Sequence, residues 1–594
     1  MNTDIENLFK DKVIGHPAGL FIIFFTEMWE RFSFYGMRIL LVLFLTAPIL
    51  GTNPGWEWPR EHALALIGTY GSMLYLTPII GGWVADKITG YKWAVIIGCF
   101  FMMLGHLSMV FETPWSLYLG LALLIIGTGF FKPNMTSMIS EMYKGKESKK
   151  DGAYTIYYMG VNAGAFFGMM LCGYLAENIG WSYGFGLAGI FMLLGLIQFW
   201  LAKDFFGQIG EKPSKVHEVE LPQNINERNP KEQDNLEQVE KLNPFTSIDK
   251  ILIILSSLGG FLYLINDPLS KVGNINLLNF ELGGLDGSYV TVLTALALFL
   301  YLIITRISRY SRVVRDKIIA VSVFAVFTVI FFAAFEQALG SMTLFARDYT
   351  ERALTGNSAI IFKIIDLILT VGPLAIITWV LILLFKKTYS KILYSNIILS
   401  ISFVFLWYIV YYKINNEFSK DTTEVPATWF GILNSFFIIT LAPLFSRWWE
   451  SKYNPSAAMK YGIGLLLLGL GFGVLVFGTL GIPQGAKTAS VSMVFLILAY
   501  LFHTMGELCI SPVGLSYLSK LVPGRMIGFM FGIWYLAIAI GQKAAGSMGG
   551  MIDKITAEYS LSSFFLIFTV VPAVFALISI VLNPMLKRLM HGVR

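Results

Sequence analysis

A fourteen-residue segment near the start of the chain, FTEMWERFSFYGMR, mixes acids and bases with large apolar residues. On a helix, at about 100° per residue, its ionisable side chains share one arc of about 140°. These residues are Glu27, Glu30, Arg31, Tyr35 and Arg38. Acid and base alternate along the arc, so a proton that neutralises one carboxylate releases a neighbouring cation to another anion. The segment therefore predicts a water-lined stripe that couples proton uptake to a change of shape.

Further charged residues stand inside otherwise apolar segments: Lys132, Glu336, Lys363, Glu507 and Lys543. Each costs roughly 2.5–3.5 kcal/mol at the centre of a membrane-spanning helix. Facing lipid together with the charges of the first stripe, they would cost more than the net stability of a typical protein. We therefore expect them to face a bundle interior or a water-filled cavity and to pair there. Purely structural ion pairs between helices remain the alternative.

The composition shows what must position these residues. Of 594 residues, 56% are hydrophobic and 14% are charged, whereas a soluble domain averages about 25% charged residues. This balance excludes a soluble enzyme, a nucleic-acid-binding module and a disordered scaffold. The net charge of +6 is explained by basic residues at the ends of membrane helices. Three cysteines in apolar segments show neither a disulfide framework nor metal-ligand spacing, so we expect no metal and no cofactor.

The apolar segments recur along nearly the whole chain and predict an all-α polytopic membrane protein with about 14–16 spans. A span needs about 17–25 mainly apolar residues. Sixteen segments qualify: 18–50, 63–86, 93–112, 115–143, 153–178, 182–202, 251–267, 288–305, 318–346, 358–385, 392–412, 427–446, 461–481, 488–519, 526–552 and 560–586.

Lysine and arginine are distributed unevenly between the two sides that these spans define. The loops on the side of the N-terminus hold 31 of them, and those on the other side hold eight. Because basic residues accumulate in cytoplasmic loops, both termini, 1–17 and 589–594, are predicted to be cytoplasmic. The long segment 203–250 is highly charged and poor in aromatics, so it predicts a flexible cytoplasmic linker.

The motif Glu27-x-x-Glu30-Arg31-Phe32-x-Phe34-Tyr35-Gly36 resembles the ExxERFxYYG signature of the proton-dependent oligopeptide transporter (POT) family of the major facilitator superfamily. Six further blocks are similar to family blocks and follow in family order. They are GGWVADKITGYK (81–92), GTGFFKPN (127–134), YYMGVNAGAFFG (157–168), FEQALGSMTLFA (335–346), LNSFFIITLAPLF (433–445) and GELCISPVGLS (506–516).

The resemblance implies the major facilitator fold, with six-helix bundles at 18–202 and 317–588. An additional helix pair would occupy 251–305, and a further pair would be inserted into the second bundle at about 357–414. The implied function is a proton-coupled symporter that imports di- and tripeptides by alternating access, in the bacterial inner membrane and as a monomer. Its partners would be peptides, protons and the lipid bilayer, with no nucleic acid.

The resemblance also implies roles for individual residues. The proton-coupling residues would be Glu27, Glu30, Arg31, Lys132 and Glu336. The peptide-binding residues would be Tyr35, Arg38, Tyr70, Lys132, Asn162, Asn434, Glu507 and Trp534. Phe34 departs from the family, which usually has a tyrosine there, and Phe332 stands where a tryptophan is common. Gly68 occupies the position of the histidine of animal members, so protonation would rest on carboxylates.

The residue types suit a zwitterionic substrate. A free peptide needs a cationic partner for its carboxylate, an anionic partner for its ammonium group and amide partners for its backbone. Arg38 and Lys132 provide the first, Glu507 the second, and Asn162 and Asn434 the third. The alternatives for Asn162 and Asn434 are interhelical hydrogen bonds, and Tyr70 and Trp534 could simply pack between helices.

A gate is predicted on the cytoplasmic side. Asp86 ends the second predicted helix, and Arg525 opens the eleventh core helix. We expect the two to pair, with help from the helix-end dipole, when the protein opens outward.

Three other functions fit these residues less well. An enzyme is disfavoured: His503 and Glu507 could share a helix face, but a zinc site needs further ligands and no nucleophile motif accompanies them. A receptor or scaffold would gain nothing from titratable stripes. A related carrier of nitrate, or of a peptide-like drug, is the nearest alternative, and Glu507 disfavours an anion.

Overall fold

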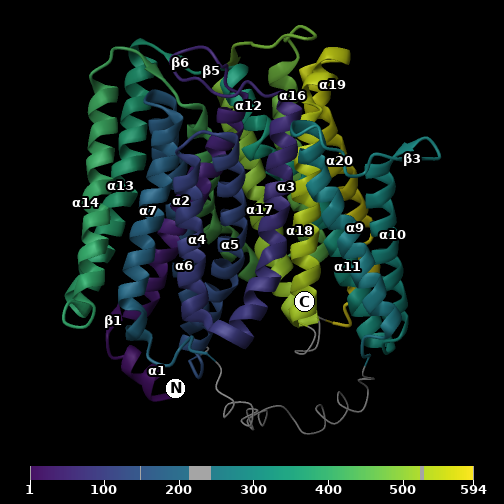
Figure 1. Ribbon diagram of the computed structural model, residues 1–594, viewed down its shortest axis with the longest axis horizontal. Coiled ribbons are helices and arrows are strands. Elements are labelled where there is room, and N and C mark those ends of the chain that lie inside the picture. The colour runs from purple at the N-terminus through teal and green to yellow at the C-terminus, as the bar shows by residue number, and fades with distance from the viewer. Residues whose placement is uncertain (1, 147–148, 213–242, 522–526, 593–594) are drawn as a thin grey trace.

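The computed structural model describes residues 2–146, 149–212, 243–521 and 527–592, and its long helices run side by side in one bundle (Figure 1). Fifteen of the sixteen predicted spans each overlap one long helix, and the span at 318–346 overlaps a broken one. Among the described residues, fourteen helices are long and apolar enough to cross a membrane. Helices satisfy their own backbone hydrogen bonds, which lipid cannot do. The predicted fold class, an all-α polytopic membrane protein, is therefore confirmed.

The first half of the chain forms six long helices after a short helix, α1 (Asn2–Leu8), and the hairpin β1 (Lys12–Val13) and β2 (His16–Pro17). The six are α2 (Ala18–Thr46), α3 (Arg60–Val84), α4 (Tyr91–Met109), α5 (Pro114–Met142), α6 (Lys150–Asn178) and α7 (Trp181–Ala202). A π-helical turn, η1 (Ala85–Thr89), extends α3, and a 3-10 turn, η3 (Lys203–Phe206), extends α7.

The second half contains a break that the sequence did not predict. The span expected at 318–346 is divided into α11 (Arg312–Phe335), the 3-10 turn η5 (Glu336–Leu339) and α12 (Ser341–Asp348), with the non-helical Gly340 between the last two. The other helices of the second half, apart from a helix pair described below, are η6 (Ala427–Gly431), α15 (Ile432–Glu450), α16 (Ala457–Thr479), α17 (Met493–Leu521), α18 (Ile527–Gly550), α19 (Ile552–Glu558), α20 (Leu561–Val581) and α21 (Asn583–Leu589).

Short strands join loops at the end of the bundle that carries α12. β5 (Thr350–Glu351) pairs with β8 (Val491–Ser492), and β6 (Ala353–Leu354) pairs with β7 (Thr423–Glu424). Below, this end is called the α12 end, and the opposite end, which carries α1, is called the α1 end (Figure 1).

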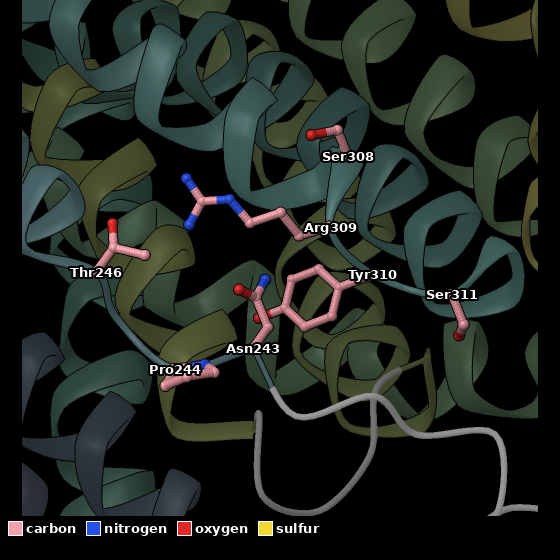
Figure 2. Close-up of a pocket in the computed structure, with 7 residues that line it drawn as sticks. All are labelled: Asn243, Pro244, Thr246, Ser308, Arg309, Tyr310 and Ser311. Carbon is pink, nitrogen blue, oxygen red and sulfur yellow. The ribbon is translucent and has the colours of Figure 1, made fainter.

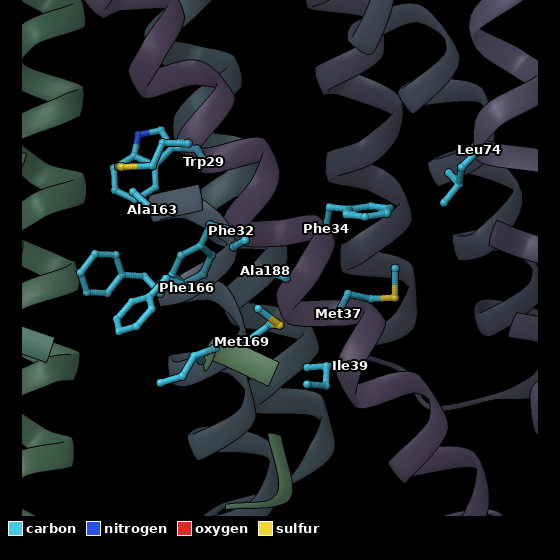
Figure 3. Close-up of a cluster of buried hydrophobic side chains, with 14 of the residues drawn as sticks. Trp29, Phe32, Phe34, Met37, Ile39, Leu74, Ala163, Phe166, Met169 and Ala188 are labelled. Carbon is cyan, nitrogen blue, oxygen red and sulfur yellow. The ribbon is translucent and has the colours of Figure 1, made fainter. Parts of the chain in front are cut away.

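Aromatic packing orients α2. The Trp29 and Phe32 rings lie against Phe191 of α7, with centroid distances of 4.7 Å and 4.4 Å. Figure 3 shows Trp29 and Phe32 on one side of α2 and Phe34 on the other. Such ring pairs add about 0.5–1.5 kcal/mol each beyond their buried area. They fix the rotation of α2 and so direct its charged arc away from α7.

A first extra helix pair, α9 (Ser247–Val272) and α10 (Gly287–Ser308), is joined by the hairpin β3 (Glu281–Leu282) and β4 (Leu285–Asp286). Asp267 of α9 forms an ion pair with Lys543 of α18. Lys543 also donates a 3.0 Å hydrogen bond from Nζ to Oγ1 of Thr69 on α3. Oγ1 of Thr69 in turn donates to the backbone oxygen of Leu264 on α9 over 3.0 Å, so the pair is bonded to both halves of the chain.

A second extra pair, α13 (Gly356–Thr388) and α14 (Leu393–Phe418), is inserted in the second half of the sequence but packs against the first half. Oγ of Ser395 donates to the backbone oxygen of Gln198 on α7 over 2.9 Å, and Nδ2 of Asn416 donates to the Tyr174 hydroxyl on α6. In Figure 1 the pair stands beside α7, on the side opposite to α9 and α10.

The α13–α14 pair is held together by a buried charge cluster. Lys413 forms ion pairs with Asp366 and, over 2.9 Å, with Glu417. The Trp429 indole of η6 donates to Asp366 over 3.0 Å. Breaking a buried ion pair from one side leaves an uncompensated charge, which costs about 3–5 kcal/mol.

We therefore expect Lys413→Ala to lower the melting temperature of the purified protein sharply. Lys420→Ala, which removes a lysine side chain from the exposed surface just beyond α14, is the matched control and should change it little. The double variant Lys413→Ala/Asp366→Ala should recover part of the loss, because the buried carboxylate leaves with its cation. Equal melting temperatures for Lys413→Ala and the wild type would contradict the structural role of the cluster.

Candidate functional site

The predicted acidic and basic residues of α2 form a buried ion-pair cluster. Arg31 lies between Glu27 and Glu30: its Nε is 3.0 Å from Oε1 of Glu27, and its Nη2 is 3.1 Å from Oε1 of Glu30. All three side chains are buried, and Oε2 of Glu30 also lies 2.5 Å from Nε of Arg31. One guanidinium thus pairs with two carboxylates. If a proton binds one carboxylate, the guanidinium and the other carboxylate remain as an ion pair with no net charge.

Lys132 of α5 lies near this cluster without joining it. Its Nζ stands 4.3 Å from the centroid of the Tyr75 ring on α3. Its charge interacts with Glu27 and Glu30, but no carboxylate in the described part of the chain lies within ion-pair distance of it. As a cation over an aromatic face it is attracted by about 0.5–2 kcal/mol. Lys132 therefore remains available to an anionic partner.

Arg38 connects the two halves of the molecule. Its Nη2 is 3.0 Å from Oε2 of Glu336, at the break after α11, and donates to Oε1 of Gln542 on α18 over 2.7 Å. The sequence did not single out Gln542. A Cβ atom at Gly71 would lie 2.6 Å from that same amide oxygen, so a glycine in α3 leaves the space in which this bond forms.

Tyr35 and Phe34 lie between the two arginines of α2. Tyr35 interacts electrostatically with Arg31 and Arg38, and also with Glu336 and Glu507 from the other half. The guanidinium carbons of Arg31 and Arg38 are 5.2 Å and 5.8 Å from the centroid of the Phe34 ring. The phenyl ring that replaces the usual family tyrosine thus offers an aromatic face to both cations.

An acid and two polar partners meet in the second half. Nδ2 of Asn434, on α15, donates to Oε2 of Glu507 over 2.9 Å and to Oγ1 of Thr504 over 3.1 Å. Glu507 and Thr504 both belong to α17, and Glu507 also interacts with Glu336. No described cation forms an ion pair with Glu507, and its side chain is only partly buried. Glu507 is therefore an acid that is held in place and open to a cationic partner.

The other predicted pocket residues are Tyr70, Asn162 and Trp534. Tyr70 is buried near Arg38, and its hydroxyl has no partner among the described residues. Nδ2 of Asn162 donates to the backbone oxygen of Tyr158 in its own helix over 2.9 Å. Trp534 lines a small cavity with Phe324, Tyr461 and other residues of the second half, which is the packing alternative raised for it from the sequence.

One residue of the predicted gate, Asp86, lies in the described part of the chain. Asp86 lies exposed in η1, at the α1 end. Arg525 lies outside the described residues, so the pairing of Asp86 with Arg525 stays a prediction.

The two halves are bonded to each other at the α12 end. Arg60 pairs with Asp348 and Asp553, both over 2.8 Å. A Cβ atom at Gly68 of α3 would lie 2.9 Å from the Cα atom of Gly546 of α18. Because two glycines allow the helices this approach, larger residues there would separate them. The structure is therefore closed at the α12 end.

The Arg38–Glu336 pair is expected to stabilise this closed end. Glu336→Gln keeps the side-chain shape but removes the charge, and a hydrogen bond to a charged group contributes about 1.5–3 kcal/mol. The equilibrium should shift toward an open α12 end by about ten- to a hundred-fold.

Spin labels at Thr52→Cys and Lys487→Cys, both exposed positions of loops at that end, report the distance between the halves. The three native cysteines are buried and should not react. A longer distance in Glu336→Gln supports the role of the pair. The same distribution in Glu336→Gln, Glu558→Gln (an exposed control) and wild type would refute it.

No group of described His, Cys, Asp and Glu residues could hold a metal ion. What the described residues bring together is one polar system. It runs from the carboxylate–guanidinium cluster of α2, through Tyr35 and Arg38, to Glu336, Gln542 and Glu507 in the other half. Such a system can exchange protons and ion-pair partners between two bodies.

The comparisons with known proteins agree with this arrangement. The sequence pattern of the POT family matches residues 76–271 and 381–566, and the chain belongs to this family. It is 29% identical to a peptide transporter of Yersinia enterocolitica, covering 97% of this chain and 96% of the relative. It is 27% identical to a di-/tripeptide transporter of Lactococcus lactis, covering 99% and 100%. A crystal structure of a peptide transporter POT in complex with sulfate superimposes with a TM-score of 0.68 at 25% identity, covering 99% of both chains.

Proposed function

We propose that this protein imports di- and tripeptides together with protons, by alternating opening of its two ends. The observation that carries the proposal is the distribution of charge between the halves. Arg38 and Lys132 belong to the first half, and Glu507 belongs to the second. Among the described residues, Lys132 has no anionic ion-pair partner and Glu507 has no cationic one. The names of the relatives in Yersinia and Lactococcus support the same substrate class.

Proton coupling follows from the shared guanidinium. With both carboxylates ionised, Glu27 and Glu30 hold Arg31 in place. A proton on one of them weakens its hold on Arg31, and the guanidinium can then turn toward a new anion. The carboxylate of a bound peptide is such an anion, so the arrival of a proton and of a peptide would favour the same rearrangement.

Peptide recognition follows from the opposite charges on facing halves. The peptide carboxylate would bind Arg38 and Lys132, and its ammonium group would bind Glu507, oriented by Asn434. A zwitterion of this length bridges the two halves. It therefore interacts better with a closed state than with an open one, which any ligand-driven change of conformation requires.

The topology is assigned from the distribution of charge. The α1 end would face the cytoplasm, because the loops at that end hold most of the lysine and arginine. The protein would lie in the bacterial inner membrane with both termini cytoplasmic and function as a monomer, without a cofactor. The structure would then be the inward-facing state, since its α12 end is closed.

The gate at the α1 end is expected to use Asp86 and Arg525. Asp86→Asn should favour the inward-facing state, because the outward-facing state would lose its ion pair. A cysteine introduced near the α1 end, on the surface that the gate covers, should then react faster with a water-soluble thiol reagent. Lys87→Gln, next to Asp86 and also exposed, serves as the control. Identical reaction rates in Asp86→Asn and wild type would exclude the gate.

A thermal-shift screen tests the substrate class. Di- and tripeptides should raise the melting temperature of the purified protein, because a ligand that binds only the folded state stabilises it. Free amino acids and nitrate should not. Stabilisation by nitrate alone would favour an anion carrier of the same family. Stabilisation by peptide-like drugs alone would favour a carrier of such drugs over a carrier of di- and tripeptides.

A further inference from the structure

A cavity of about 540 Å³ opens at the α1 end, where α9 begins, α10 ends and α11 begins. Its lining comes from residues 243–246 and 308–311. Figure 2 shows the Arg309 guanidinium extending toward Thr246, with Asn243 and Tyr310 beside it. None of the lining residues belongs to the polar system between the two halves, so this cavity is separate from the proposed transport site.

The described carboxylate next to the cavity, that of Asp249, already forms ion pairs. Asp249, in the first turn of α9, is fully buried and accepts from Arg306 over 3.2 Å and from Arg309 over 2.8 Å. The Arg306 side chain is buried beneath the cavity and also donates to the backbone oxygen of Asn243 and to the Tyr310 hydroxyl. One carboxylate thus balances two guanidinium groups, and the cluster keeps one net positive charge.

Hydrogen-bond donors remain beside the cavity. The Tyr310 hydroxyl accepts a hydrogen bond from Arg306 over 3.1 Å, so its own proton is free to be donated. Arg309 is about one-third exposed, at 35% of its side chain, and a guanidinium has five N–H groups. A donor-rich, positively charged cavity suits an anion with several oxygens.

The surroundings of the cavity indicate where that anion comes from. Next to it, α9 and α10 turn large apolar side chains outward: Ile248 is 64% exposed and Ile304 is 65% exposed. Only 17% of the most apolar window of each helix is buried inside the protein. These surfaces would lie against lipid acyl chains. The cavity therefore stands at the boundary between the headgroups and the acyl chains of the leaflet at the α1 end.

We propose that this cavity binds the phosphate of an anionic phospholipid, such as phosphatidylglycerol, whose acyl chains lie along α9 and α10. The phosphate would accept hydrogen bonds from Arg309 and Tyr310. Basic pockets between membrane helices on the cytoplasmic side are suited to such headgroups. The bound lipid would connect the extra helix pair with the start of α11, the first core helix of the second half.

Native mass spectrometry of the full-length protein in detergent tests this site, with added phosphatidylglycerol, phosphatidylcholine or inorganic phosphate. Phosphatidylglycerol should bind with higher affinity than phosphatidylcholine, and millimolar inorganic phosphate should not displace it. Arg309→Gln should weaken phosphatidylglycerol binding about five-fold, since one basic residue contributes about 1 kcal/mol near a lipid surface. Arg306 still pairs with Asp249 in this variant, so the fold should be kept.

Two further variants make the result specific. Tyr310→Phe should also weaken phosphatidylglycerol binding, whereas Arg447→Gln, an exposed arginine at the α1 end of α15, should leave it unchanged. Equal binding of the two lipids would overturn the proposal, as would equal losses in Arg309→Gln and Arg447→Gln. Displacement of the lipid by inorganic phosphate would show a site for soluble phosphate instead.

Discussion

In proteoliposomes with an inward proton gradient, Glu30→Gln should fail to concentrate a dipeptide, while the wild type accumulates it. Glutamine keeps the size of the side chain and can still accept a hydrogen bond from Arg31, but it cannot take up and release a proton. Dipeptide exchange at equal pH on both sides should survive in the variant, because exchange needs no net proton movement. Both assays use labelled dipeptide and the same preparation of vesicles.

Glu27→Gln should behave like Glu30→Gln, since both carboxylates share Arg31. Glu558→Gln, which changes an exposed carboxylate in α19, should concentrate peptide as the wild type does. Loss of both accumulation and exchange would indicate a damaged binding site. Full accumulation in both Glu27→Gln and Glu30→Gln would remove the cluster from the coupling mechanism.

Glu507→Gln should bind a free dipeptide about ten- to a hundred-fold more weakly than the wild type does. The expected loss is one charge-assisted contact of about 1.5–3 kcal/mol, between the Glu507 carboxylate and the peptide ammonium group. N-acetylation of the dipeptide should cost the wild type a similar factor and cost Glu507→Gln little more. Binding can be measured by calorimetry or by competition with a labelled peptide.

A C-terminally amidated dipeptide is the matched control for this experiment. It lacks the carboxylate that Arg38 and Lys132 would bind, so its affinity should fall by a similar factor in both proteins. If acetylated and free dipeptides compete equally for the wild type, Glu507 does not recognise the amino terminus. The peptide assignment would then lose its main physical support.

The sequence predicted the helices well because their signal is strong and local. In lipid a chain has few alternatives to long apolar helices, and every expected span except the broken one at 318–346 overlaps one long helix. The charged arc of α2 was also predictable, since a period of 3.6 residues fixes which side chains share a face. Arg31 does lie between Glu27 and Glu30.

What the sequence could not provide were contacts between distant segments. Gln542 is an ordinary polar residue in an apolar helix, and its role depends on Gly71 and Arg38, hundreds of residues away. The break at Glu336 was missed because the apolar residues on both sides of Glu336, Gln337 and Gly340 fit the length of a single span. The packing of α13 and α14 against the first half could not be predicted from the sequence either. Periodicity shows which face of a helix is apolar but not which helix covers that face.

Proton movement caused by peptide tests the central claim most directly. Wild-type protein is reconstituted in liposomes that contain a pH-sensitive dye, with equal pH on both sides and the membrane potential clamped. A dipeptide added outside should acidify the interior at a rate that follows its own uptake. Peptide uptake without acidification would contradict proton coupling, and the absence of any peptide uptake would contradict the assigned substrate.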